Sequence, residues 1–183
     1  MRHASLRDLK AIYRRFQAHH DVFPHIRQDA LKRRIEAGQC VYQDGVVITF
    51  QRYRKRTRVG DVQVPAGAIM LHQILNSRQF NGAGSKVFRQ FVDEVVKPSG
   101  GNLYLAVRRE NAVARGFYER HGMIEVGTVA WAGGTIPGLV YRLSAKVSDP
   151  RCSNLICVQT KFPTQQLLLP TRFHFGDIFR TSR

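Results

Sequence analysis

The segment with the clearest chemical use in this chain is Gln-Phe-Asn-Gly-Ala-Gly, residues 79–84. It joins a strand-like apolar run to a helix-like one. Glycine lets the backbone approach an anion closely, and a helix that begins at Ser85 would aim N–H groups and a partial positive charge at the same point. The segment therefore predicts a phosphate-binding loop, and the residues expected to form it are Gln79, Asn81, Gly82, Ala83, Gly84 and Ser85.

Two common phosphate-binding loops do not fit this spacing. A P-loop has lysine directly after its last glycine, but Ser85 follows Gly84 here and the lysine comes one position later. A dinucleotide fingerprint has a third glycine where Val87 stands, and an acidic residue about 20 positions further on, where residues 104–107 contain none. The pattern that remains is Gln-x-x-Gly-x-Gly.

The apolar periodicity predicts the elements that position this loop, and they make a mixed α/β domain. We expect a short strand at 1–5, helices at 9–16 and 27–37, and a hairpin of 40–43 and 46–53 around Asp44-Gly45. After a basic connector at 54–58 come a strand at 68–75, a helix from 85, a strand at 103–107, a helix at 111–121, and strands at 123–131 and 138–143.

A second segment resembles a known pattern together with the loop. Residues 103–123 read as a strand, then Asn111-x-x-Ala114, then Phe117-Tyr118 and a closing Gly122. The two segments, in this order and at this separation, resemble the two signatures of the GCN5-related N-acetyltransferases (GNAT). The resemblance covers about residues 1–145.

This resemblance implies a single-domain α/β GNAT fold over residues 1–146, with a mixed, mostly antiparallel sheet, a splayed central strand pair and flanking helices. Residues 147–183 lie outside it as a C-terminal extension without an assigned role. Their apolar runs are interrupted by Pro163 and Pro170. The extension has three open readings, which are packing on the domain, an added edge strand, and contacts in a homodimer.

The resemblance also implies the chemistry. Acetyl-CoA is the expected acyl donor, transferring its acetyl group directly to an amine in a ternary complex. Its arm would lie along the strand that ends at Ile74-Leu75, where a backbone N–H would bind the thioester carbonyl. Tyr118 would protonate the leaving thiolate. Asn111 either contacts the arm of acetyl-CoA or caps its helix.

The sequence departs from several relatives at the general base: they have a glutamate at the position of Ala68, and residues 68–77 contain no carboxylate. His72 is the titratable side chain of this strand, and strict alternation places it on the same face as Met70 and Ile74. A buried core histidine is the alternative. Removal of the proton by water, or an amine that is already neutral, would require no base.

The net charge of +16, from 29 basic and 13 acidic residues, indicates a polyanionic partner such as nucleic acid. Residues 1–58 carry 14 basic and 5 acidic residues, whereas residues 59–100 carry 4 and 3, so the loop does not explain the excess. The densest run is a candidate nucleic-acid site, with an inert basic surface as the alternative. It contains Arg52, Arg54, Lys55, Arg56 and Arg58.

Three functions therefore stay open: a GNAT N-acyltransferase with a nucleic-acid or nucleic-acid-bound acceptor, a DNA-base-modifying acyltransferase of the phage Mom type, and a catalytically inactive GNAT-fold nucleic-acid-binding protein. His19, His20 and His25 lack a cysteine or carboxylate at metal-ligand spacing, so no metal site is expected. Without an apolar run of about 18 residues, we expect a cytoplasmic protein with no membrane partner. Trp131 and the turn after it are expected to flank the acceptor site.

Overall fold

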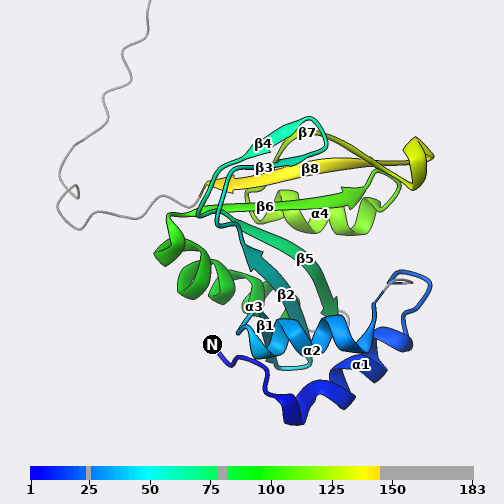
Figure 1. The fold of residues 1–183 in the computed structure, drawn as a ribbon, viewed down its shortest axis with the longest axis vertical. Helices are drawn as coiled ribbons and strands as arrows, with labels where there is room; N and C mark the ends of the chain where they lie inside the picture. The colour runs from blue at the N-terminus through cyan, green and yellow to red at the C-terminus, as the bar shows by residue number, and fades with distance from the viewer. Residues whose placement is uncertain (24–25, 78–81, 145–183) are drawn as a thin grey trace, which may run out of the picture. The chain divides into compact units, whose positions relative to one another are not determined.

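The computed structural model of the protein describes residues 1–23, 26–77 and 82–144. Six of the described strands form one sheet, in which β5 and β6 are parallel and the other neighbours are antiparallel. Figure 1 shows this sheet dividing into two wings that meet where β5 and β6 meet. In spatial order its strands are β1 (Cys40–Gln43), β2 (Val46–Arg52), β5 (Ile69–Asn76), β6 (Asn102–Arg108), β8 (Ile136–Ser144) and β7 (Ile124–Trp131).

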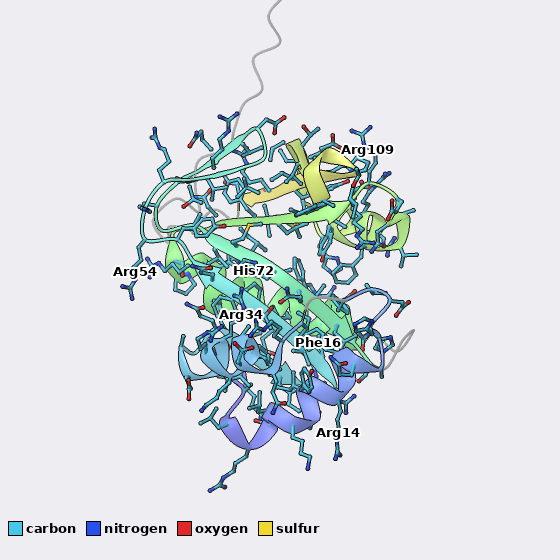
Figure 2. All side chains as sticks on the ribbon, turned by 45° about the vertical axis from the view of Figure 1, so that its right-hand side comes forward. Arg14, Phe16, Arg34, Arg54, His72 and Arg109 are labelled. Carbon is cyan, nitrogen blue, oxygen red and sulfur yellow. The ribbon has the colours of Figure 1, made fainter. Side chains whose placement is uncertain are left out.

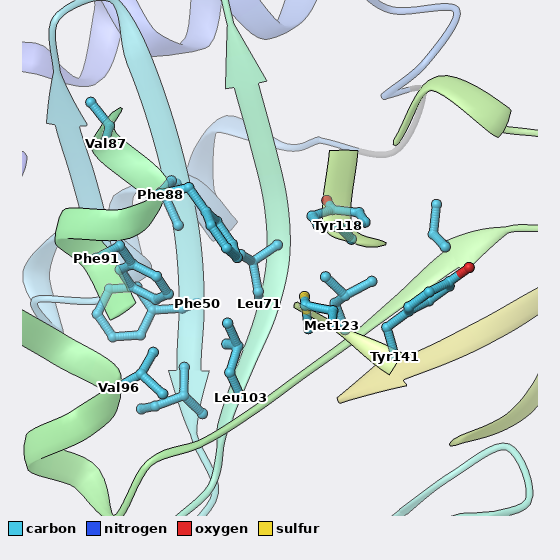
Figure 3. Close-up of a cluster of buried hydrophobic side chains, with 14 of the residues drawn as sticks. Phe50, Leu71, Val87, Phe88, Phe91, Val96, Leu103, Tyr118, Met123 and Tyr141 are labelled. Atoms are coloured by element: carbon cyan, nitrogen blue, oxygen red, sulfur yellow. The ribbon is translucent and has the colours of Figure 1, made fainter. Parts of the chain in front are cut away.

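Helices cover both faces of the β1–β2–β5 wing because neighbouring residues of β2 point to opposite faces. Val47 packs in a buried cluster with residues of α1 (Leu9–Gln17) and α2 (Gln28–Glu36). Ile48 packs in a second cluster with residues of α3 (Ala83–Phe91) and α4 (Ala112–Arg120). Figure 3 shows the centre of this second cluster, where Phe50 and Phe91 meet edge to face with ring centroids 5.1 Å apart.

The parallel pair of β5 and β6 is short. The two strands pair at Ile69, Met70 and Leu71 only, after which β5 continues to Asn76 without a β6 partner. On its other side β5 stays paired with β2, but Thr49 pairs with Gln73 and the next residue, Phe50, with Leu71. His72 is therefore the extra residue of a β-bulge, which bends a strand and increases its twist. Figure 1 shows β5 and β6 diverging along their lengths.

These features confirm the predicted mixed α/β fold with its mostly antiparallel sheet and splayed central pair. The predicted first strand is wrong, because residues 1–5 make a single bridge, between His3 and Val41. The Asp8 carboxylate accepts hydrogen bonds from both the backbone N–H and the hydroxyl of Ser5, and this capping interaction turns the chain into a short 3-10 helix at Leu6–Asp8.

The basic connector was also predicted incompletely. Its end belongs to β3 (Thr57–Val59), which forms a separate two-stranded hairpin with β4 (Val62–Val64). Asp61, in the turn between them, accepts hydrogen bonds from the backbone N–H and the hydroxyl of Thr128 on β7, at 2.7 and 2.9 Å. Strands of three residues carry little periodic signal, so this hairpin depends on a contact between segments 67 residues apart.

Candidate active site

The divergence of β5 and β6 opens a cavity of about 920 Å³. His72, Gln73 and Ile74 line it from β5, and Ala106, Val107 and Arg108 from β6. A cavity of this size accommodates a small-molecule ligand. Between His72 and Leu75 no β6 residue pairs with β5, so this edge can receive an extended ligand through main-chain hydrogen bonds.

The described part of the glycine loop lies just beyond the end of β5. Gly82 has φ +73° and precedes α3, which begins at Ala83 and so two residues before the predicted start. Gly84 is buried, and a Cβ added to it would lie 3.2 Å from the side-chain nitrogen of Asn76 at the end of β5. The absence of a side chain thus lets the helix start close to the strand. Gln79 and Asn81 lie outside the described residues.

Tyr118 lines the cavity from α4, and 5% of its surface is exposed. Its ring lies near Phe88 and Tyr141, with centroids 6.3 and 6.4 Å away (Figure 3). Burial raises the pKa of the phenol above its usual value of 10, so the hydroxyl is protonated at neutral pH, as a free phenol is, and is a weaker acid than a free phenol. A proton donor must hold its proton before transfer, and this environment satisfies that condition.

Asn111 lines the same cavity and also caps α4. Its side-chain oxygen accepts a hydrogen bond of 3.0 Å from the backbone N–H of Ala114. The side-chain oxygen of Asn111 is thus used for helix capping. Because Asn111 also lines the cavity, the residue is still within reach of a ligand there.

His72 lies in the cavity wall, although β5 does not follow strict alternation around it. Alternation predicted that His72, Met70 and Ile74 share a face, whereas Met70 and Ile74 pack in different clusters because the bulge interrupts the alternation. The Nε2 atom of His72 is buried without a hydrogen-bond partner. Burial, together with the nearby positive charge of Arg34, lowers the pKa of His72 to about 4, so the imidazole is neutral at pH 7.

Two carboxylates of the cavity wall were not predicted. Asp21, in the connection between α1 and α2, and Glu110, after β6, both line the cavity. Glu110 is 66% exposed and lies 3.6 Å from the Arg108 guanidinium. Asp21 stands in a loop without a motif, and Glu110 directly precedes Asn111 of the second signature without being one of its matched residues. The predicted flanking role of the 131–138 turn agrees with the cavity wall, which includes Trp131, Ala132 and Ile136.

Not every predicted site residue reaches the cavity. The side chain of Leu75 packs in the cluster under α1 and α2, whereas the prediction for this residue concerns the backbone N–H groups of β5. The basic run lies toward the other end of β5, since Arg52 pairs with Ile69, at the start of β5, and Val46 with Asn76, at its end. All five cations of the run are exposed, and within the described chain none of them makes an ion pair.

Comparison with solved structures gives matches of fold at low sequence identity. An acetyltransferase of the GNAT family from Bacillus cereus is 16% identical, with a TM-score of 0.58 over 78% of this chain and 94% of that one. A ribosomal-protein-S18-alanine N-acetyltransferase from Escherichia coli is 17% identical, with a TM-score of 0.54 over 80% and 94%. The chain has the GNAT fold. A PaiA N-acetyltransferase from Thermoplasma acidophilum, solved with coenzyme A, is 15% identical, with a TM-score of 0.56 over 77% and 95%.

No protein-family model matches the sequence, and no curated protein does. The assignment of the GNAT fold thus depends on the similarity to solved structures, in agreement with the resemblance to the two short signatures. Within residues 1–23, 26–77 and 82–144, no three His, Cys, Asp or Glu side chains are grouped to hold a metal ion. In the same ranges no helix is long and apolar enough to cross a membrane.

Proposed function

We propose that the protein is an acetyl-CoA-dependent N-acyltransferase that transfers the acetyl group directly to an amine. The observation that carries this proposal is the cavity between the splayed halves of β5 and β6, which places Tyr118 and the open edge of β5 around one space. At the far end of β5, Gly82 and the first turn of α3 provide N–H groups for a pyrophosphate.

In this mechanism the amine nitrogen attacks the thioester carbonyl carbon. A backbone N–H of β5 near Ile74 stabilises the oxyanion of the tetrahedral intermediate, which collapses with cleavage of the carbon–sulfur bond. Tyr118 donates its proton to the departing thiolate, and the amine loses one proton. His72 is the proposed acceptor of that proton. Its low pKa keeps it unprotonated but makes it a weak base, so Asp21 and Glu110 are further candidates in the same wall.

The acceptor that we propose is a nucleic acid or an amine bound to one. The exposed run Arg52–Arg58 contains five cations without an ion-pair partner in the described chain, and this density suits a phosphate backbone. Figure 2 shows Arg54 extending away from the sheet at the edge of the molecule.

A second candidate, a GNAT-fold nucleic-acid-binding protein without catalysis, is favoured by one observation. The only titratable side chain that β5 contributes to the cavity is His72, with a pKa of about 4. A protein of this kind would bind nucleic acid but would not turn over acetyl-CoA with any amine.

Calorimetry with acetyl-CoA tests the donor site. Ser85→Glu places a carboxylate in the first turn of α3, where it would repel the pyrophosphate, and we expect the affinity to fall at least about tenfold. Val113→Glu is the matched control, because Val113 lies in the first turn of α4 and is 85% exposed. Equal affinities of wild type and Ser85→Glu would contradict the proposed pyrophosphate site, and absence of any binding would remove the enzymatic function.

Mass spectrometry of acetyl transfer to small amines, peptides, tRNA and DNA tests the acceptor. We expect product on a nucleic-acid or nucleic-acid-bound amine, and binding of that acceptor to weaken steeply with added salt. The triple variant Arg54→Gln, Lys55→Gln, Arg56→Gln should lose most of this affinity while keeping its affinity for acetyl-CoA. Product on DNA bases alone would favour the Mom-type alternative. Nucleic-acid binding without any product would favour the inactive protein.

A further inference from the structure

A second, smaller pocket adjoins the cavity on the side of β5 that α2 covers. Its volume is about 120 Å³, and Ile26 and Gln73 line both hollows. The small pocket is apolar where Phe16 and Leu31 line it, and its polar wall contains Arg34 of α2 and Thr49 of β2. The Thr49 hydroxyl donates a hydrogen bond to the side-chain oxygen of Gln73. This volume fits a group of a few atoms only.

Arg34 is the unusual residue of this pocket. It is half-buried and donates one hydrogen bond, of 3.2 Å, to the carbonyl oxygen of Phe50. In the described part of the chain no carboxylate lies within ion-pair distance of it. Three titratable groups lie near its charge, namely Cys40, Tyr53 and His72, and all three are neutral at pH 7, since burial raises the pKa of the thiol and of the phenol and lowers that of the imidazole. Withdrawing a guanidinium from water without a counter-charge is unfavourable, and an anionic ligand would compensate it.

Arg34 lies in the small pocket and is near both the cavity wall and the basic run. Its charge acts on the pKa of His72, in the cavity wall, and on that of Tyr53, inside the basic run. Figure 2 shows Arg34 and His72 close together beside β5. An acceptor whose amine lies in the cavity can thus reach Arg34 with a neighbouring anionic group.

We propose that this pocket is a subsite for a small anionic group of the acceptor, a carboxylate or a phosphate, which the Arg34 guanidinium binds beside Thr49 and Gln73. The subsite selects acceptors that carry such a group a few ångströms from the reacting amine. This inference rests on the proposed function, because it assigns the bound anion to an acceptor.

Nuclear magnetic resonance tests the subsite without turnover. Inorganic phosphate and acetate are titrated separately into the full chain saturated with acetyl-CoA, which occupies the glycine loop. We expect saturable shifts of the Arg34 Nε–H signal and of the Gln73 backbone amide. Tighter binding of phosphate assigns the group as a phosphate, and tighter binding of acetate assigns it as a carboxylate.

Three variants decide the role of Arg34. In Arg34→Gln the affinity measured at the Gln73 amide should fall at least about tenfold, since a charge-assisted hydrogen bond is lost. Arg34→Lys keeps the charge and should retain part of the affinity. Arg33→Gln, on the same turn of α2 but 69% exposed, should bind as wild type does. Circular dichroism and the unchanged affinity for acetyl-CoA establish that each variant is folded.

Two results would overturn the inference. The first is a protein that binds acetyl-CoA but shows no saturable shift at Arg34, or binds the anion equally well in Arg34→Gln. This result would remove the subsite and leave the proposed function intact. The other is anion binding at Arg34 in a protein that binds no acetyl-CoA. That result would remove the proposed function and, with it, the assignment of the anion to an acceptor.

Discussion

The two halves of β5 differ in pairing, burial and chemistry although they are continuous in sequence. Ile69, Met70 and Leu71 pair with both β2 and β6 and are at most 6% exposed. From Gln73 to Asn76 the strand pairs with β2 and not with β6, and three of these four residues are partly exposed. The first half joins the two wings of the sheet, and the second half exposes an edge to a cavity. A single bulge residue separates a structural segment from a proposed ligand-binding one.

The largest expected effect is a loss of stability from a substitution in the half of β5 that pairs with both β2 and β6. Leu71→Ala should lower the free energy of unfolding by about 4 kcal/mol, because it leaves a cavity in the core beside Phe50. Ile74 lies in the open half of β5 and is partly exposed. Ile74→Ala should lower the free energy of unfolding by only about 1 kcal/mol, and it should weaken acetyl-CoA binding. Urea unfolding and calorimetry measure the two quantities. Equal losses of stability in the two variants would contradict the division of β5 into a structural and a binding half.

The free energy of unfolding should depend on pH because of the bulge residue, His72. His72 has a pKa of about 4 in the folded protein and near 6.5 when unfolded, so between these values the unfolded chain takes up a proton that the folded protein does not. The free energy of unfolding should therefore fall by about 3 kcal/mol as the pH decreases from 6.5 to 4, and this contribution should level off below pH 4.

His72→Gln tests this assignment because it removes the histidine contribution and leaves the other titrating groups in place. Urea unfolding at several pH values should show a shallower decrease for the variant. Parallel curves for the two proteins would show that His72 is not buried in its neutral form.

The next effect concerns Tyr118, which faces the open half across the cavity. Tyr118→Phe should lower the rate of acetyl transfer about 100-fold, since the thiolate loses its proton donor, and should leave the affinity for acetyl-CoA near that of wild type. The control is Tyr141→Phe. This phenol donates a hydrogen bond of 2.7 Å to Glu119, and its loss should cost about 1 kcal/mol of stability without changing the rate. An unchanged rate in Tyr118→Phe would remove its role as acid.

Local signals in the sequence were sufficient for most of the fold. The Asp44-Gly45 turn predicts the β1–β2 hairpin, and Asn111 and Gly122 bound α4, because caps and tight turns depend on a few neighbouring residues. The glycine pattern locates the start of α3 to within two residues. Those signals place Tyr118 in α4 and Asn111 at its N-cap, whereas their proposed roles come from the resemblance to the second GNAT signature.

Only the tertiary structure decided what surrounds these residues. The bulge at His72, the end of β5–β6 pairing at Leu71 and the approach of Arg34 to His72 each arise between segments that no local pattern relates. The same holds for Asp21 and Glu110, which join one cavity wall from distant loops. Turns and caps are encoded over about four residues, whereas a cavity forms where strands part, and that depends on the packing of the whole sheet.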